Sequence, residues 1–128
     1  MKHNVLVMDD DASLCRLYTL LLNRFGYDAD TVQSGEEALT LYKQNMKAGT
    51  PYLAVILDLK VQSDMGGVEV LHELLALDPT VYAIVSSGIS ADKTRSTYKA
   101  QGFRDILPKP FRPHELAECL KRLPDATA

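Results

Sequence analysis

Five short apolar segments alternate with five segments whose apolar residues have helical spacing. The expected strands cover residues 4–8, 28–32, 53–57, 81 to 86 or 87, and 105–107. The expected helices cover residues 12–25, a stretch that begins after Ser34, 68–77, 91–101 and 113–123. Because strictly alternating strands and helices are joined by crossover connections, the pattern predicts an α/β fold whose parallel sheet is covered on both faces.

Local signals mark several helix ends. Ser34 followed by Glu37 has the spacing of a capping box at the start of the second helix. Gly26 is expected to end the first helix, and Asp78 with Pro79 the third. The residues expected to face inward from the first helix are Leu14, Leu17, Tyr18, Leu21, Leu22 and Phe25.

Length and composition indicate one ordinary globular domain. The 128 residues are 46% hydrophobic and 24% charged, and we expect a single domain over 1–128 with its core at about 4–123 and no output domain. A net charge of −3 argues against direct nucleic-acid binding. No apolar run approaches the length of a membrane span, which favours a cytoplasmic protein without membrane contact. Cys15 and Cys119 are too few for a disulfide framework and are expected to be semi-buried thiols.

Charged and hydroxyl residues follow four of the five expected strands. They are Asp9, Asp10 and Asp11 after the first, Asp58 after the third, Ser86 and Ser87 at the end of the fourth, and Lys109 after the fifth. In an open parallel sheet the carboxyl ends of the strands lie along one edge, where ligands bind. We therefore expect these groups to meet in one crevice. Asp11 is expected to complement the dipole of the first helix.

The residue types indicate phosphoryl chemistry. Carboxylate oxygens favour a hard cation, Mg²⁺ with Mn²⁺ as an alternative. Asp58 is then a candidate nucleophile that forms an aspartyl phosphate. The Lys109 ammonium and the Ser87 hydroxyl are suited to bind the phosphoryl oxygens. Since no general base for turnover is evident, the site is expected to hold a phosphoryl group instead of acting as a conventional enzyme.

From residue 4 to residue 123 the chain resembles the receiver domain of bacterial two-component response regulators. The matching motifs are Val5-Leu6-Val7-Met8-Asp9-Asp10-Asp11, Val55-Ile56-Leu57-Asp58-Leu59, Ile84-Val85-Ser86-Ser87-Gly88 and Leu107-Pro108-Lys109-Pro110-Phe111. The resemblance implies a single flavodoxin-like (βα)5 domain with sheet order 2-1-3-4-5. The long loop over residues 58–67 looks like that of receivers attached to hybrid sensor histidine kinases.

The resemblance also implies a role for each site residue. Asp9 and Asp10 would bind the metal, with Asp10 the more direct ligand, and the Lys60 backbone carbonyl would be a further ligand. Asp58 would be both phosphoacceptor and metal ligand. Ser87 would be the switch hydroxyl, and Lys109 would bind phosphate. The family spacing before Lys109 favours Ser87 over Ser86 as that hydroxyl. The bond before Pro110 is expected to be cis. Ile106 stands where receivers often carry a switching aromatic residue, which puts that switch in doubt.

The partner implied by the resemblance is a histidine kinase or a histidine phosphotransfer domain that docks across the first helix. The expected contact residues are Ser13, Arg16, Leu20 and Asn23, which lie away from the core stripe. An exposed Leu20 would mark a contact, although an incidental exposed leucine explains it equally well. Phosphorylation is expected to shift the surface from the fourth strand to the fifth helix, and a phosphorylation-dependent homodimer stays open.

Three other functions compete with this interpretation. A phosphatase with an aspartate nucleophile needs a second Asp two positions later, where this chain has Lys60. A flavin or nucleotide carrier would place phosphate after the first strand, where the three carboxylates would repel it. A degenerate receiver that only binds protein would not need the intact acids, hydroxyl and lysine.

Overall fold

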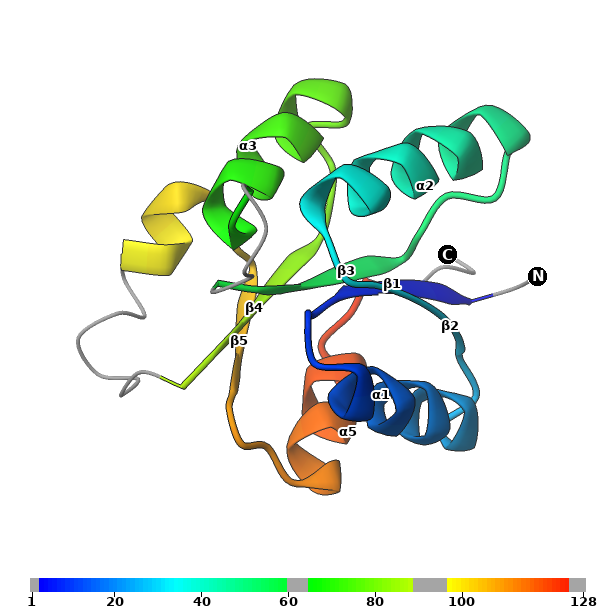
Figure 1. Cartoon of the computed structure of the whole chain (residues 1–128), viewed down its shortest axis with the longest axis vertical. Coiled ribbons are helices and arrows are strands. Elements are labelled where there is room, and N and C mark those ends of the chain that lie inside the picture. Colours follow the sequence, from blue (N-terminus) through cyan, green and yellow to red (C-terminus); the bar gives the residue numbers. More distant parts are fainter. Residues whose placement is uncertain (1–2, 60–64, 89–96, 125–128) are drawn as a thin grey trace.

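A computed structural model describes residues 3–59, 65–88 and 97–124 of the chain (Figure 1). The strands are β1 (Asn4–Met8), β2 (Asp28–Val32), β3 (Ala54–Asp58), β4 (Ala83–Ser87) and β5 (Asp105–Pro108). The helices are α1 (Ala12–Arg24), α2 (Gly35–Ala48), α3 (Gly67–Leu77) and α5 (Pro113–Lys121), and residues 97–101 are also helical.

All five strands pair in parallel in the order β2-β1-β3-β4-β5. Helices α1 and α5 lie on one face of the sheet, and α2 and α3 lie on the other (Figure 1). Both the expected fold class and the expected strand order are therefore confirmed. The carboxyl ends of β1, β3 and β4 adjoin at one edge, which is where the candidate site lies.

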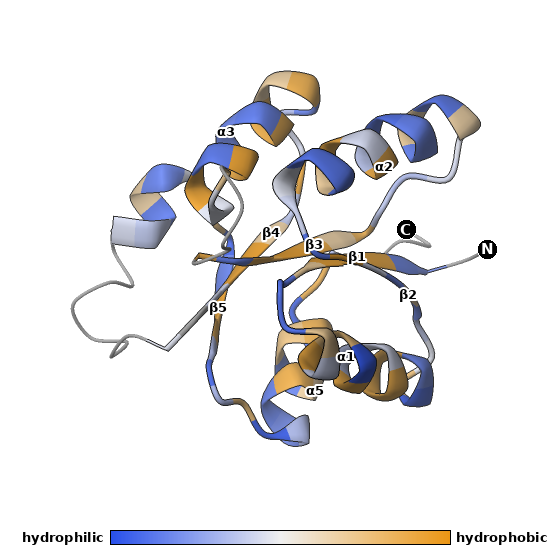
Figure 2. Cartoon of the chain, viewed as in Figure 1, coloured by the Kyte–Doolittle hydropathy of each residue, from blue (hydrophilic) through white to orange (hydrophobic). Residues whose placement is uncertain are grey.

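The alternation of side chains along β1 explains why its sequence is a continuous apolar run. Val5 and Val7 pack in the core under α1 and α5, whereas Leu6 and Met8 pack in the core under α2 and α3. All four are fully buried, because a central parallel strand has helices on both faces. Hydrophobic residues accordingly predominate in the central strands β1, β3 and β4, whereas the edge strand β2 is more polar (Figure 2).

The helix starts follow the capping signals. The Ser34 hydroxyl accepts a hydrogen bond from the Glu37 N–H at 3.2 Å, and the Glu37 carboxylate accepts from the Gln33 N–H at 3.3 Å. The cap is therefore confirmed, with Glu37 reaching one residue further back than in a standard capping box. Asp11 caps α1, since its carboxylate accepts from the Ser13 and Leu14 N–H groups.

Two expected boundaries differ from the structure by two residues, and others differ by one. Strand β4 begins at Ala83, two residues later than expected, because the Val81 N–H turns back to bond the Asp78 carbonyl at 3.1 Å. Helix α5 ends at Lys121, two residues earlier than expected. The next two N–H groups, of Arg122 and Leu123, bond carbonyls only three residues back, which is a tighter turn than an α-helix. Most of the helix expected over 91–101 lies outside the described residues, and only 97–101 can be compared.

The expectation that Leu17 faces the core is wrong. Its side chain is 39% exposed, while Tyr18, Leu21 and Leu22 on the same helix are buried. Those three residues already fill the contact between α1 and the sheet, so Leu17 lies at the edge of the stripe. Both cysteines are free thiols, as expected, and both are buried more fully than expected. Within the described residues, none of the helices combines the length and apolarity needed to cross a membrane.

Candidate functional site

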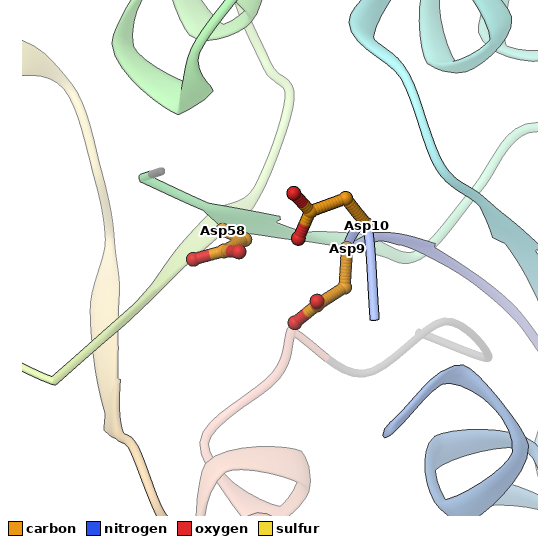
Figure 3. Close-up of side chains that lie close together, drawn as sticks. All are labelled: Asp9, Asp10 and Asp58. Carbon is orange, nitrogen blue, oxygen red and sulfur yellow. The ribbon is translucent and has the colours of Figure 1, made fainter. Parts of the chain in front are cut away.

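Three carboxylates converge at the ends of β1 and β3 (Figure 3). One oxygen from each of Asp9, Asp10 and Asp58 lies within 4.8 Å of the other two. Asp9 is 1% exposed and Asp58 5% exposed, whereas Asp10 is half-buried. Buried like charges at this spacing repel strongly, so the site needs a cation to be stable.

Lys109 supplies one positive charge. Its Nζ donates to Asp9 Oδ2 at 2.9 Å and to Asp58 Oδ2 at 3.2 Å. Burial by itself would lower the pKa of Lys109, but the hydrogen bond and charge of Asp9 and the charge of Asp58 outweigh it and raise the pKa. The ammonium therefore stays charged and joins the ends of β1, β3 and β5.

The backbone around Asp9 fixes its carboxylate. Oδ1 of Asp9 accepts from the Asp11 N–H at 2.9 Å, while Oδ2 accepts from Lys109. The Asp9 N–H donates to the Val32 carbonyl at 3.0 Å, and the Cys15 thiol donates to the Asp9 carbonyl at 3.2 Å. Asp9 is thus held at both oxygens and through its backbone, as a rigid member of the acidic cluster.

Two glycines at the start of α3 set the position of Asp58. A Cβ on Gly67 would lie 2.8 Å from the Asp58 carbonyl oxygen, and a Cβ on Gly66 would lie 3.0 Å from the Leu59 carbonyl oxygen. Real Cβ atoms do not approach an oxygen at 2.8 Å, so α3 can lie against the β3 end only because Gly67 has no side chain. Sequence reasoning did not identify this positioning role, although two glycines shortly after a strand end are its signal.

Ser86 and Ser87 end β4 and have different surroundings. Ser86 is 1% exposed, and its hydroxyl accepts a hydrogen bond from the Tyr18 hydroxyl on α1 at 3.3 Å. The Ser87 backbone pairs with Pro108 of β5, but its side chain lies outside the described part of the structure, as does all of Lys60. Tyr18 was expected only as a core residue, and no sequence signal indicated its polar contact.

The donor set fits a hard divalent cation. Three carboxylates against one ammonium leave an excess of negative charge inside a cluster 4.8 Å across. Oxygen ligands at this density are typical of Mg²⁺ sites. The bond between Lys109 and Pro110 is cis, as expected.

The four residues expected to contact a partner are all exposed on α1. Ser13, Arg16 and Asn23 are exposed on the same helix as Leu20, which is 60% exposed. The exposed Leu17 adds to this apolar surface. A hollow of about 300 Å³ lies beside it, lined by Leu14, Leu17, Lys109, Pro110 and Phe111.

A parallel five-stranded sheet in this order, with an acidic cluster and a lysine at its carboxyl edge, is the arrangement of a receiver-type domain. Residues 5–121 match the family model of the response regulator receiver domain. The chain belongs to this family, the receiver domains of two-component signalling.

Curated relatives include full-length regulators. The chain is 29% identical over 121 residues to the transcriptional regulatory protein ZraR of Salmonella typhimurium, covering 94% of this chain and 26% of that protein. It is 36% identical over 115 residues to the probable transcriptional regulator ycf27 of Porphyridium aerugineum, covering 90% of this chain and 45% of that protein. The chain therefore spans less than half the length of these two relatives.

Solved structures have the same fold over nearly the whole of this chain. The chemotaxis protein CheY4 of Vibrio cholerae superimposes with a TM-score of 0.83 at 25% identity, covering 97% of this chain and 100% of that chain. A receiver domain protein from Methanospirillum hungatei superimposes with a TM-score of 0.80 at 22% identity, covering 94% and 92% of the two chains. The latter similarity supports the fold alone.

Proposed function

We propose that Asp58 accepts a phosphoryl group from a phosphohistidine and that this chain is a signalling switch in a two-component phosphorelay. The observation that carries the proposal is the buried Asp58 carboxylate, held by Lys109 beside Asp9 and Asp10. Membership of the receiver family supports the same reaction. In this proposal residues 1–128 form the receiver domain, with its core at about 4–123. The domain acts in the cytoplasm.

The transfer exchanges one bond to phosphorus for another. The ionised Asp58 oxygen attacks the phosphorus, an O–P bond forms, and the N–P bond to the donor histidine breaks. The electron pair of the broken bond stays on the imidazole nitrogen. Because the attacking group is already a carboxylate anion, no general base has to remove a proton. Water later attacks the phosphorus, which returns Asp58 and releases inorganic phosphate.

Asp10 and Asp58 are the proposed direct ligands of Mg²⁺ or Mn²⁺, with Asp9 in support and the Lys60 backbone carbonyl as a further ligand. Both oxygens of Asp9 already accept hydrogen bonds, which supports the indirect role given to Asp9. When bound, the metal offsets the charge on the phosphoryl oxygens. Lys109 Nζ lies 3.2 Å from Asp58 Oδ2, which supports the proposal that it binds a phosphoryl oxygen on Asp58.

Ser87 is the proposed hydroxyl that binds the remaining phosphoryl oxygen. Ser86 is the alternative, but its hydroxyl is engaged with Tyr18, which favours Ser87. Phosphorylation would then bias the surface formed by β4, β5 and α5 between two states. Ile106 is half-buried against the core on the α3 side, so this shift proceeds without an aromatic side chain at position 106.

The proposed partner is a histidine kinase or a histidine phosphotransfer domain that docks on α1. The apolar surface of Leu17 and Leu20 lies beside the hollow next to Lys109, so a partner seated there would reach the phosphoacceptor. Ser13, Arg16 and Asn23 would form the polar rim of this contact. The proposal includes no direct contact with nucleic acid or membrane, and a phosphorylation-dependent homodimer remains a second assembly to test.

Docking on α1 makes a specific kinetic prediction. Leu20→Asp should slow phosphoryl transfer from a phosphorylated histidine phosphotransfer domain by about tenfold or more, because it places a charge in a buried apolar contact. Transfer from acetyl phosphate should be unchanged. Leu77→Asp, which changes an exposed leucine at the end of α3, is the matched control. Equal rates for both variants with the protein donor would contradict docking on α1.

Beryllofluoride titration tests the proposed function itself, since this anion mimics a phosphoryl group on a carboxylate. Calorimetry should detect Mg²⁺-dependent binding to the wild-type chain and no binding to Asp58→Ala. Steady turnover of a phosphomonoester would instead support the competing hydrolase. Absence of beryllofluoride binding to the wild type would contradict the phosphoacceptor assignment.

A further inference from the structure

Tyr18 places a hydroxyl group in the buried interior beside the acidic cluster. The residue lies on α1 and is fully buried, and its hydroxyl donates to Ser86 Oγ at 3.3 Å. Burial raises the pKa of Tyr18, and the negative charges of Asp9 and Asp58 raise it further, although the bond to Ser86 lowers it. The phenol therefore stays protonated. A phenol is also a better donor than an aliphatic hydroxyl, which makes Tyr18 the donor of this bond.

Ser86 is the nearest neighbour of Asp58 on the adjacent strand. The two residues stand opposite each other in the parallel pairing of β3 and β4. The Ser86 carbonyl also accepts the N–H of Leu59, the residue after Asp58, at 3.3 Å. Because residues paired in this way have side chains on the same face of the sheet, the Ser86 hydroxyl lies beside Asp58 on the α1 side.

The same face of α1 contacts two other segments that carry site residues. One turn before Tyr18, the Cys15 thiol donates to the Asp9 carbonyl. The ring of Tyr18 lies 4.9 Å from that of Phe111, two residues after Lys109. A single helix face thus contacts the segments that contain Asp9 and Lys109, and also Ser86, which pairs with Asp58.

We propose that Tyr18 is a positioning residue for the phosphoacceptor site, which it tunes through its hydrogen bond to Ser86. This inference rests on the proposed function of Asp58. With Tyr18 as donor, Ser86 must direct its own hydroxyl proton elsewhere, and the anionic Asp58 side of the strand is the electrostatically favourable direction. The bond fixes the end of β4 against α1, so the geometry beside Asp58 depends on a helix that also carries the proposed docking surface.

Loss of the Tyr18 hydroxyl would release the Ser86 side chain without opening a cavity. A neutral hydrogen bond of this kind corresponds to about a threefold to tenfold change in an equilibrium constant. If the bond positions the site, that change appears in the affinity for a phosphoryl mimic. If the bond only stabilises the fold, it appears in the melting temperature and leaves the affinity unaltered.

The test measures Mg²⁺-dependent beryllofluoride affinity by calorimetry, well below the melting temperature, for Tyr18→Phe, Ser86→Ala and the double variant. Each single variant should bind about threefold to tenfold more weakly than the wild type. The double variant should bind no more weakly than the weaker single variant, because both changes remove one interaction. Ser86→Thr keeps the hydroxyl and should restore most of the affinity lost in Ser86→Ala.

Tyr42→Phe is the matched control. Tyr42 is also a buried tyrosine, and its hydroxyl donates to Asp78 at 2.7 Å, next to the opposite end of the sheet. This variant should lose stability yet bind beryllofluoride with wild-type affinity. Wild-type affinity in Tyr18→Phe, or additive losses in the double variant, would overturn the positioning role while leaving the proposed function intact. Failure of the wild type to bind would overturn both.

Discussion

Replacing Asp58 with asparagine should stabilise the metal-free protein, although it removes the proposed phosphoacceptor. The side chain is nearly isosteric, so the change acts mainly through charge. Asp58 lies within 4.8 Å of carboxylate oxygens of Asp9 and Asp10, and 3.2 Å from Lys109 Nζ. Among these charged groups, the variant therefore loses two repulsions and one attraction.

The distances set the size of this effect. With an effective dielectric constant of about 20, each repulsion costs about 3.5 kcal/mol at 4.8 Å, which is the upper limit of these oxygen separations, and the attraction at 3.2 Å contributes about 5 kcal/mol. The two repulsions exceed the attraction by about 2 kcal/mol. For a domain of this size, a gain of that order should raise the melting temperature by about 6 to 10 °C.

Thermal unfolding in the presence of a chelator, followed by circular dichroism, measures this change. Adding Mg²⁺ should then stabilise the wild type but have little effect on Asp58→Asn, because a ligand raises stability only when it binds the folded state. Asp105→Asn is the control, since that buried carboxylate is bonded to Arg122 Nε at 2.7 Å. It should be destabilised, because the change removes an attraction. A lower melting temperature for Asp58→Asn in chelator would refute the charge argument.

Two further predictions concern the glycine beside Asp58 and a pH-dependent contact at the far end of the sheet. Gly67→Ala should destabilise the fold by about 1–3 kcal/mol and weaken beryllofluoride binding, because its Cβ would meet the Asp58 carbonyl oxygen at 2.8 Å. Gly26→Ala is the control, since the backbone there is strained for alanine at φ +93° but no atom lies nearby. It should lower the stability measured by urea unfolding and leave beryllofluoride binding unchanged. Burial alone would raise the pKa of Asp78, but hydrogen bonds from Thr80 and Tyr42 outweigh it and lower the pKa from 3.8. The stability that these hydrogen bonds contribute is present above pH 3.8 and is lost as the pH falls through the folded-state pKa of Asp78. In urea titrations, the stability difference between wild type and Tyr42→Phe should therefore shrink as the pH falls below 3.8. A difference that stays constant with pH would contradict this.

The acidic site could be anticipated because it depends on topology alone. Once strands and helices alternate, the residues that follow the strands must lie along one edge of the sheet. Asp9, Asp10, Asp58 and Lys109 come together for this reason, although Lys109 is 100 positions from Asp9 in the sequence.

The contacts that position the site could not be anticipated in the same way. Tyr18 has the spacing of a core residue, and its polar contact depends on the strand pairing that places Ser86 opposite Asp58. The approach of Gly67 to the Asp58 carbonyl depends on how closely α3 packs against β3. Leu17 satisfied the helical pattern, but the stripe that α1 buries is narrower than that pattern. Each of these features is set by tertiary packing, which the local sequence does not encode.

Intact-mass spectrometry after incubation with acetyl phosphate and Mg²⁺ tests the central claim most directly. The wild-type chain should gain the mass of one phosphoryl group, the added group should be labile at alkaline pH as an acyl phosphate is, and Asp58→Ala should gain nothing. An unmodified wild-type mass, or the same gain in Asp58→Ala, would contradict the assignment of Asp58 as the phosphoacceptor.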